Sequence, residues 1–154
     1  MKKVPLAKPD INKSDIDGVV SVLKSGWLSL GPRLRSFEQD FAAKLGLNYA
    51  VAVNSGTSSL LASLYALDIK QDDEVLVPSF TFVATVNAIT AIGAKPVFVD
   101  VEDDTFNIDP TKIEQKITKK TKAILVVDLF GHLCDYDVIN KIAKNNNLIL
   151  KLLF

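Results

Sequence analysis

Small polar residues and glycine follow the apolar run at residues 50–53, where the chain reads Asn-Ser-Gly-Thr-Ser from residue 54 to residue 58. Glycine lets a backbone turn approach a ligand closely, and the free N–H groups at the start of a helix attract an anion. One interpretation is a phosphate site at Gly56, Thr57 and Ser58. The other is an ordinary capped helix start, since serine and threonine are favoured N-caps. Taken alone, the stretch favours the second.

The same stretch excludes two common phosphate-binding motifs. It lacks the Gly-Lys-Ser/Thr ending of a Walker P-loop, and it is not a Gly-x-Gly-x-x-Gly fingerprint. A nucleoside triphosphate and a dinucleotide are therefore both disfavoured as ligands.

Phe82 and Asp128 stand at two further positions where an apolar run ends. The ring of Phe82 could stack on a planar ligand. The general rule that phenylalanine is buried favours a core position instead. The carboxylate of Asp128 closes the apolar run Ile-Leu-Val-Val and needs a partner or water. It is either a partnered group or a solvated residue at a strand end.

The remaining reactive residue types give weaker signals. His132 is the only histidine and so the only side chain with an ordinary pKa near neutrality, but a lone loop histidine is more often structural than catalytic. No second histidine or cysteine stands at metal-ligand spacing, so we expect no metal site. No serine or cysteine lies in a recognisable nucleophile elbow.

The elements that must position these residues alternate along the chain. Apolar spacing and glycine caps predict helices over residues 14–24, closing at Ser25-Gly26, and 32–45, closing at Gly46. After them we expect strand 49–53, helix 57–67, strand 74–78, helix 81–92, strand 96–101, helix 110–117, strand 122–128, helix 135–145 and an apolar run from Leu148. This order predicts an α/β domain with a mainly parallel sheet and helices on both faces. Segments at the carboxyl ends of its strands then converge.

Composition narrows the class of protein. The 154 residues suit one domain, and the 48% hydrophobic and 8% aromatic content is typical of a globular chain. Eighteen basic residues balance eighteen acidic ones, which disfavours nucleic acid and a membrane surface as partners. Cys134 is the only cysteine, no secretory signal is evident, and no run of about twenty apolar residues exists to span a bilayer. We therefore expect a cytoplasmic protein.

Several motifs occur in one order: VPLAKPDI, SGWLSLGPRLRSFEQDFA, YAVAVNSGTSSL, DDEVLVPSFTFVATVNAI, GAKPVFVDVEDDTFNIDPTKIEQKIT and TKAILVVDLFGHLCDYDVI. From Val4 to Leu150 the chain resembles the N-terminal part of the DegT/DnrJ/StrS type of sugar-nucleotide aminotransferase. The resemblance implies a fold-type-I enzyme that uses pyridoxal 5'-phosphate and is normally a homodimer. Such an enzyme moves an amino group, usually from glutamate, to a nucleotide-linked keto-sugar, as in polysaccharide biosynthesis.

The resemblance also implies roles for single residues. Gly56, Thr57 and Ser58 fall on the motif that holds the cofactor phosphate, and Phe82 falls on the aromatic residue that stacks against the pyridine ring. The segment 26–32 matches one near the active-site entrance.

A third segment of the resemblance carries small departures. Phe130-Gly131 matches the family's aromatic-glycine pair, with Asp128 where histidine is frequent and His132 where glutamine is common. Leu133 replaces a usual proline.

The last residues depart from the family pattern more sharply. The family continues with an acidic pair whose aspartate contacts the pyridine nitrogen, and Leu153 stands at that aspartate's position. The Schiff-base lysine falls beyond residue 154. The resemblance thus predicts an incomplete large domain over residues 1–154, with no second domain, no catalytic residue and weak cofactor binding.

Three hypotheses about function follow. The first is a truncated member of the aminotransferase family. The second is an inactive fragment or pseudoenzyme that at most binds phosphate or pairs with a full-length homologue. A small nucleotide-binding module of the Rossmann type is disfavoured, because the glycine fingerprint is missing.

Overall fold

The computed structural model describes residue 5 and residues 7–153, with side chains up to residue 150. The chain divides into two compact units, unit 1 (Met1–Ala52) and unit 2 (Val53–Phe154). Within the described residues, no helix is long and apolar enough to cross a membrane.

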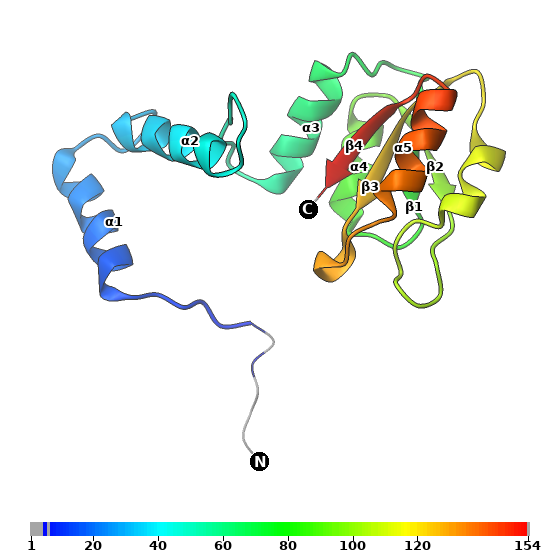
Figure 1. The fold of residues 1–154 in the computed structure, drawn as a ribbon. Helices are drawn as coiled ribbons and strands as arrows, with labels where there is room; N and C mark the ends of the chain where they lie inside the picture. Colours follow the sequence, from blue (N-terminus) through cyan, green and yellow to red (C-terminus); the bar gives the residue numbers. More distant parts are fainter. Residues whose placement is uncertain (1–4, 6, 154) are drawn as a thin grey trace. The chain divides into compact units, whose positions relative to one another are not determined.

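Unit 1 contains helices α1 (Lys13–Ser25) and α2 (Pro32–Lys44) (Figure 1). The side chain of Asn12 accepts the N–H groups of Ser14 and Asp15, and the Asp15 carboxylate accepts the N–H of Asn12 in return. This capping box satisfies donors that the first turn leaves free. Gly26 ends α1 in the left-handed region, at φ 70°. Both predicted helices are confirmed.

Unit 2 is built on a four-stranded parallel sheet with the strand order β2-β1-β3-β4 (Figure 1). All four strands run in one direction, as predicted. Two of their three connections contain an α-helix, whereas the connection from the second strand to the third contains only 3-10 turns. The elements in chain order are α3 (Gly56–Ala66), β1 (Glu74–Pro78), α4 (Val83–Ala91), β2 (Lys95–Val99), the 3-10 turns η1 (Pro110–Lys112) and η2 (Glu114–Lys116), β3 (Thr121–Val127), the 3-10 turn η3 (Leu129–Gly131), α5 (Tyr136–Asn145) and β4 (Ile149–Leu153).

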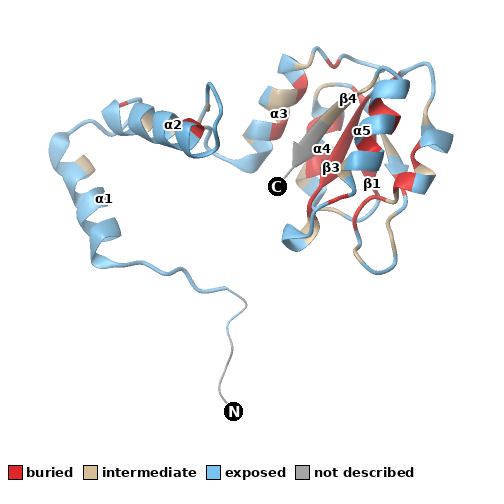
Figure 2. Cartoon of the chain, viewed as in Figure 1, coloured by how far each residue is buried: buried red, intermediate tan, exposed pale blue. Residues whose placement is uncertain are grey.

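The sheet is buried on both faces, as Figure 2 shows for its central strands. Side chains along β3 alternate between two cores, because successive residues of a strand point to opposite faces. Leu125 packs in the core that includes Leu60 of α3 and Ile89 of α4. Ile124 packs in the core that includes Ile139 of α5. The expectation of helices on both faces is confirmed.

The strand predicted over residues 49–53 is wrong. These residues have no strand conformation, and the sheet of the described chain gives them no neighbour. A strand exists only where its backbone groups pair with another strand. Here the N–H of Ala52 donates to Oε1 of Glu38 at 2.9 Å, and the side chain of Val51 is exposed. The apolar run is typical of a strand, but this segment has no neighbouring strand in the described chain to pair with.

The helix predicted over residues 110–117 is also wrong. Two separate 3-10 turns replace it, and Ile117 already has extended backbone at φ −74° and ψ 131°. Turns of this kind are typical of short connecting pieces, since an eight-residue helix gains little from its own hydrogen bonds. Burial of Ile113 in the α5-side core fixes the segment instead.

Candidate functional site

A cavity of about 360 Å³ lies at the carboxyl ends of β1 and β3 and beside the first turn of α3. This volume falls within the range of small-molecule pockets. All three segments singled out in the sequence contribute to it, so their expected convergence is observed. The lining residues are Gly56, Thr57, Leu60, Thr81, Phe82, Ala84, Thr85, Val127, Asp128, Leu129 and Phe130.

The first turn of α3 is both capped and open. Ser55 is the N-cap, and its Oγ accepts the N–H of Ser58 at 3.1 Å. The hydroxyl of Ser58 in turn donates to Oδ1 of Asn54 at 2.6 Å. In the part of the chain that the structure describes, the N–H groups of Gly56 and Thr57 have no acceptor. Ser58 is therefore used within the helix start, whereas Gly56 and Thr57 keep free donors at the cavity.

Two exposed aromatic rings lie at this cavity. Phe82 immediately precedes α4 and is 74% exposed, so its interpretation as a core residue is wrong. Phe130 lies in η3 and is 93% exposed. Exposed phenylalanine rings beside a concave site provide apolar contact area for a flat ligand.

Asp128 is only 6% exposed, so its interpretation as a solvated strand-end residue is wrong. Its Oδ1 accepts the backbone N–H of Cys134 at 2.9 Å and the hydroxyl of Tyr136 at 2.7 Å. Its Oδ2 is buried and has no hydrogen-bond partner among the described residues. These bonds fix one side of the carboxylate and leave the other side as a spare acceptor.

The neighbours of Asp128 keep their protons at neutral pH. Burial, and then the hydrogen bond and negative charge of Asp128, raise the pKa of the Cys134 thiol to about 12. The same two causes, in the same order, raise the pKa of the Tyr136 hydroxyl above its ordinary value. Tyr136 is thus a permanent donor to Asp128 and Cys134 is an unreactive thiol.

Asn107 is a residue that the sequence did not single out. It is 2% exposed, its Nδ2 donates to the carbonyl of His132 at 2.9 Å, and its Oδ1 accepts the N–H of Leu129 at 3.1 Å. No local signal marks it, because its partners lie 22 and 25 residues further along the chain. His132 contributes its carbonyl to this contact, and its side chain is exposed.

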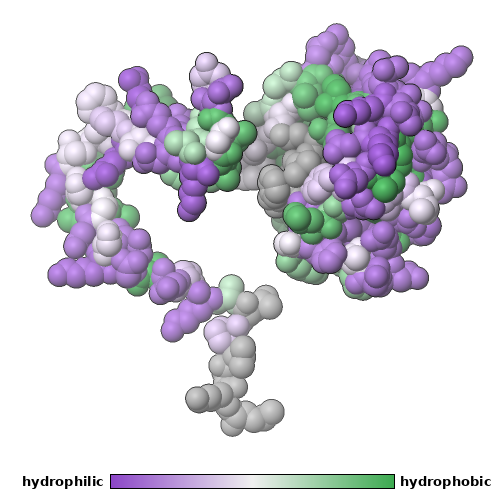
Figure 3. All heavy atoms as spheres, viewed as in Figure 1, coloured by the Kyte–Doolittle hydropathy of each residue, from purple (hydrophilic) through white to green (hydrophobic). Residues whose placement is uncertain are grey.

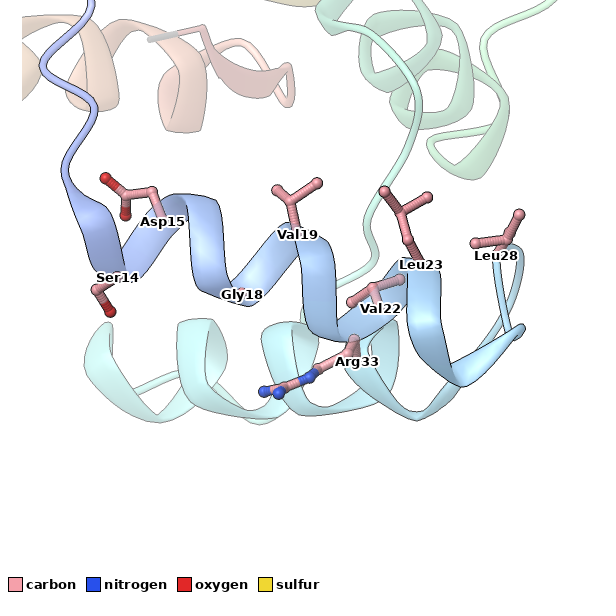
Figure 4. Close-up of a pocket in the computed structure, with 8 residues that line it drawn as sticks. All are labelled: Ser14, Asp15, Gly18, Val19, Val22, Leu23, Leu28 and Arg33. Atoms are coloured by element: carbon pink, nitrogen blue, oxygen red, sulfur yellow. The ribbon is translucent and has the colours of Figure 1, made fainter.

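A second cavity lies within unit 1. It measures about 750 Å³ and is lined by Ser14, Asp15, Gly18, Val19, Val22, Leu23, Leu28 and Arg33 (Figure 4). Apolar side chains of α1 dominate it, and the carboxylate of Asp15 already caps the helix. Among the described residues, no group of three or more histidine, cysteine, aspartate or glutamate residues could hold a metal ion. Within the described chain, the unpaired N–H donors of Gly56 and Thr57 and the unpartnered Oδ2 of Asp128 instead belong to residues that line the cavity of unit 2.

Known proteins resemble this chain over nearly its whole length. A model of the DegT/DnrJ/EryC1/StrS aminotransferase family matches residues 9–151. The spore coat polysaccharide biosynthesis protein SpsC of Bacillus subtilis is 44% identical over 147 residues, which cover 96% of this chain and 38% of SpsC.

A second relative is the dTDP-3-amino-3,6-dideoxy-alpha-D-galactopyranose transaminase of Aneurinibacillus thermoaerophilus. It is 50% identical over 127 residues, which cover 82% of this chain and 35% of the relative. The crystal structure of NtdA from Bacillus subtilis with bound cofactor PMP superposes with a TM-score of 0.86 at 39% identity. That match covers 89% of this chain and 32% of NtdA. The chain thus spans less than two fifths of the length of these relatives.

Proposed function

Because the chain belongs to the DegT/DnrJ/EryC1/StrS aminotransferase family, we propose that its strand-end cavity binds the phosphate and ring of pyridoxal 5'-phosphate. The observation that carries the proposal is the free N–H pair of Gly56 and Thr57 beside the exposed ring of Phe82. An anion site and an aromatic surface on one cavity match a ligand that is a flat ring with a phosphate attached.

The residues present fit this cofactor. The start of α3 combines unpaired N–H donors with the positive end of the helix dipole, which suits a phosphate. Gly56 and Thr57 both line the cavity, and a Cβ atom built on Gly56 meets nothing within 4 Å, so the chain leaves open space beside this residue. Oδ2 of Asp128, buried without a partner in the described chain, is a spare acceptor in a residue that borders the same cavity.

Pyridoxal 5'-phosphate supplies an electron-withdrawing ring that accepts and returns an amino group. The chain's own residues bind and orient it. The N–H groups of Gly56 and Thr57 would hold the phosphate, and the exposed ring of Phe82 would give the cofactor ring an apolar contact and shield it from water. Tyr136 and the N–H of Cys134 hold the Asp128 carboxylate in one orientation beside the cavity.

The relatives support a proposal for the role of the whole protein. We propose amino transfer from glutamate to a nucleotide-linked keto-sugar, in a homodimer, with residues 1–154 as part of the cofactor-binding domain. The 50% identity to a dTDP-aminosugar transaminase supports this choice. None of the described residues that line the cavity is a lysine, so for this chain we propose non-covalent binding of the cofactor.

The first test is a titration of the folded chain with pyridoxamine 5'-phosphate, which forms no covalent bond with a lysine. We expect saturable binding that inorganic phosphate competes away. Phe82→Leu should weaken it about two- to tenfold, the loss expected for one aromatic contact. Phe98→Leu is the matched control, because Phe98 is a half-exposed ring on β2 outside the cavity. A folded sample without saturable binding, or equal weakening by both variants, would contradict the proposal.

A second measurement separates the two family hypotheses. Pyridoxal 5'-phosphate is added to the chain, the mixture is reduced with borohydride, and the product is analysed by mass spectrometry. Saturable labelling of one lysine would support an active enzyme that uses a lysine of this chain. Binding of pyridoxamine 5'-phosphate without such labelling would support a cofactor-binding part that does not catalyse.

A further inference from the structure

The side chain of Asn107 joins two segments of unit 2 that are far apart in the sequence. Asn107 lies between β2 and η1. The nitrogen and the oxygen of its side-chain amide each form a hydrogen bond with the turn that follows β3. The donor Nδ2 reaches the carbonyl of His132, and the acceptor Oδ1 receives the N–H of Leu129. One buried side chain therefore holds both ends of η3.

Asn107 is itself held in place within its loop. Its backbone N–H donates to Oγ1 of Thr105 at 3.1 Å, and its carbonyl accepts the N–H of Glu102 at 2.9 Å. Oγ1 of Thr105 donates in turn to Oε2 of Glu102 at 2.6 Å. Because the backbone of Asn107 is held within its loop and its side chain is buried, this residue can impose a position on its partners.

The turn that Asn107 holds has an unfavourable conformation. Phe130 lies in the left-handed region at φ 54° and ψ 22°, where a residue with a Cβ atom is strained. Such a conformation persists only where surrounding contacts over-determine it. The internal bonds are those from the N–H of Gly131 to the Asp128 carbonyl and from the N–H of His132 to the Leu129 carbonyl.

The ring of Phe130 is 93% exposed, so packing does little to hold it. Its position depends on the backbone of η3. Asn107 holds that backbone at Leu129 and His132. Beyond the turn, the N–H of Cys134 donates to the carboxylate of Asp128. Phe130 lines the strand-end cavity together with Phe82.

We infer that Asn107 is a positioning residue that holds η3, and through it the ring of Phe130, at the rim of the strand-end cavity. A flat ligand then meets a second aromatic residue already in place, without the entropy cost of ordering the turn on binding. The identity of that ligand rests on the proposed function, whereas the contact between Asn107 and the turn does not.

The first test needs no ligand. Hydrogen–deuterium exchange of the full chain is compared for wild type, Asn107→Ala and Asn107→Asp. Asn107→Ala should speed exchange across residues 129–134. Asn107→Asp keeps the acceptor for Leu129 but replaces the donor to His132 with an oxygen that repels its carbonyl, so it should also speed exchange there. Unchanged exchange in both variants would overturn the inference, and Asn107→Asp carries the test if Asn107→Ala fails to fold.

Thr121→Ala is the matched control for a general loss of stability. Thr121 is buried, and its Oγ1 accepts the N–H of Thr118 at 2.9 Å, but it lies at the opposite end of β3 from the cavity. This variant should leave the exchange of residues 129–134 unchanged. Acceleration there as large as in Asn107→Ala would mean that the turn merely responds to stability, and would overturn the inference.

The second test uses two probes, pyridoxamine 5'-phosphate and inorganic phosphate. Asn107→Ala should weaken the first about two- to tenfold, as for one aromatic contact, and leave the second unchanged. Equal affinity of wild type and Asn107→Ala for pyridoxamine 5'-phosphate would overturn the inference. If wild type itself does not bind this probe, the proposed function fails, and the exchange experiment still decides the role of Asn107.

Discussion

The two units of the chain stabilise their helices in different ways. Among the described residues of unit 1, only Gly31 and Ala42 are buried, and large apolar side chains of α1 such as Val19 and Leu23 are about 60% exposed. Apolar atoms are visible among the hydrophilic ones on these helices in Figure 3. In unit 2, two separate cores of buried side chains cover both faces of the sheet.

This difference shows which interactions each unit depends on. Helix α1 has a capping box at Asn12, a glycine in the left-handed region at its end and an apolar stripe with no buried residue. Isolated helices of this length are marginal in water, so local capping carries much of the stability of α1. In unit 2 the burial of apolar side chains against the sheet dominates.

The largest expected effect tests the core of unit 2 against the surface of unit 1. Leu125→Ala removes a fully buried side chain from β3 and should lower the free energy of unfolding by about 2–5 kcal/mol. Leu23→Ala on α1 should lower it by about 0.5 kcal/mol or less. Urea unfolding followed by circular dichroism measures both. Equal losses would show that α1 is as well packed as the sheet.

Loss of the α1 cap should have a smaller and local effect. Asn12→Ala removes the acceptor for the N–H groups of Ser14 and Asp15 and should destabilise the helix by about 1 kcal/mol. Amide exchange by NMR should become faster in α1 and stay unchanged in β3. Asn12→Ser is the control that keeps a cap. Faster exchange throughout unit 2 would contradict a local effect of this cap.

The pH dependence should come from unit 2. The pKa of Cys134 is raised to about 12 in the folded chain, so the unfolded chain loses this proton first as the pH rises. Folded protein then binds more protons than unfolded protein, and the free energy of unfolding falls above about pH 9. Cys134→Ala should make this fall shallower in urea titrations at alkaline pH. An unchanged slope would show that the thiol is not protected by burial.

The smallest effect should come from an ion-pair cluster on unit 2. Nζ of Lys112 lies 3.2 Å from Oδ2 of Asp100 and 3.4 Å from Oδ2 of Asp109, and all three side chains are at least partly exposed to solvent. Lys112→Gln should shift the urea midpoint only slightly, and the shift should vanish in about 1 M salt, where charges are screened within about 3 Å. Lys122→Gln serves as the control, because Lys122 is an exposed lysine of β3 outside this cluster. A large salt-independent shift would mean that Lys112 contributes through packing.

Regular elements were predictable where a local pattern and a tertiary partner coincide. The strand predicted over residues 74–78 has those bounds in the structure, and α1, α2, α3, α4 and α5 agree with the predicted helices within two residues at most ends. The predictions over residues 49–53 and 110–117 failed for opposite reasons. Residues 49–53 have an apolar pattern typical of a strand but no neighbouring strand among the described residues to pair with. Residues 110–117 form two 3-10 turns, because a helix of eight residues gains little from its own hydrogen bonds.

The candidate site was predictable in part. The helix start at Gly56 and Thr57 and the strand-end residues Phe82 and Asp128 stand out because their types are unusual after apolar runs. Their roles toward a cofactor stay predictions. Only the hydrogen bonds of the folded chain show that, among the described residues, the N–H groups of Gly56 and Thr57 are free, whereas the N–H of Ser58 is occupied.

The sequence by itself determined the α/β alternation, the two capped helices and the residue types at the strand ends, because each depends on neighbours within a few positions. It also determined the family, because several motifs follow one another in one order along the chain. Only the tertiary structure decided that Phe82 is exposed, that Asp128 is buried, and that Asn107 holds the turn carrying Phe130. These properties depend on which distant segments meet, and burial and hydrogen bonding between residues more than twenty positions apart leave no periodic trace along the chain.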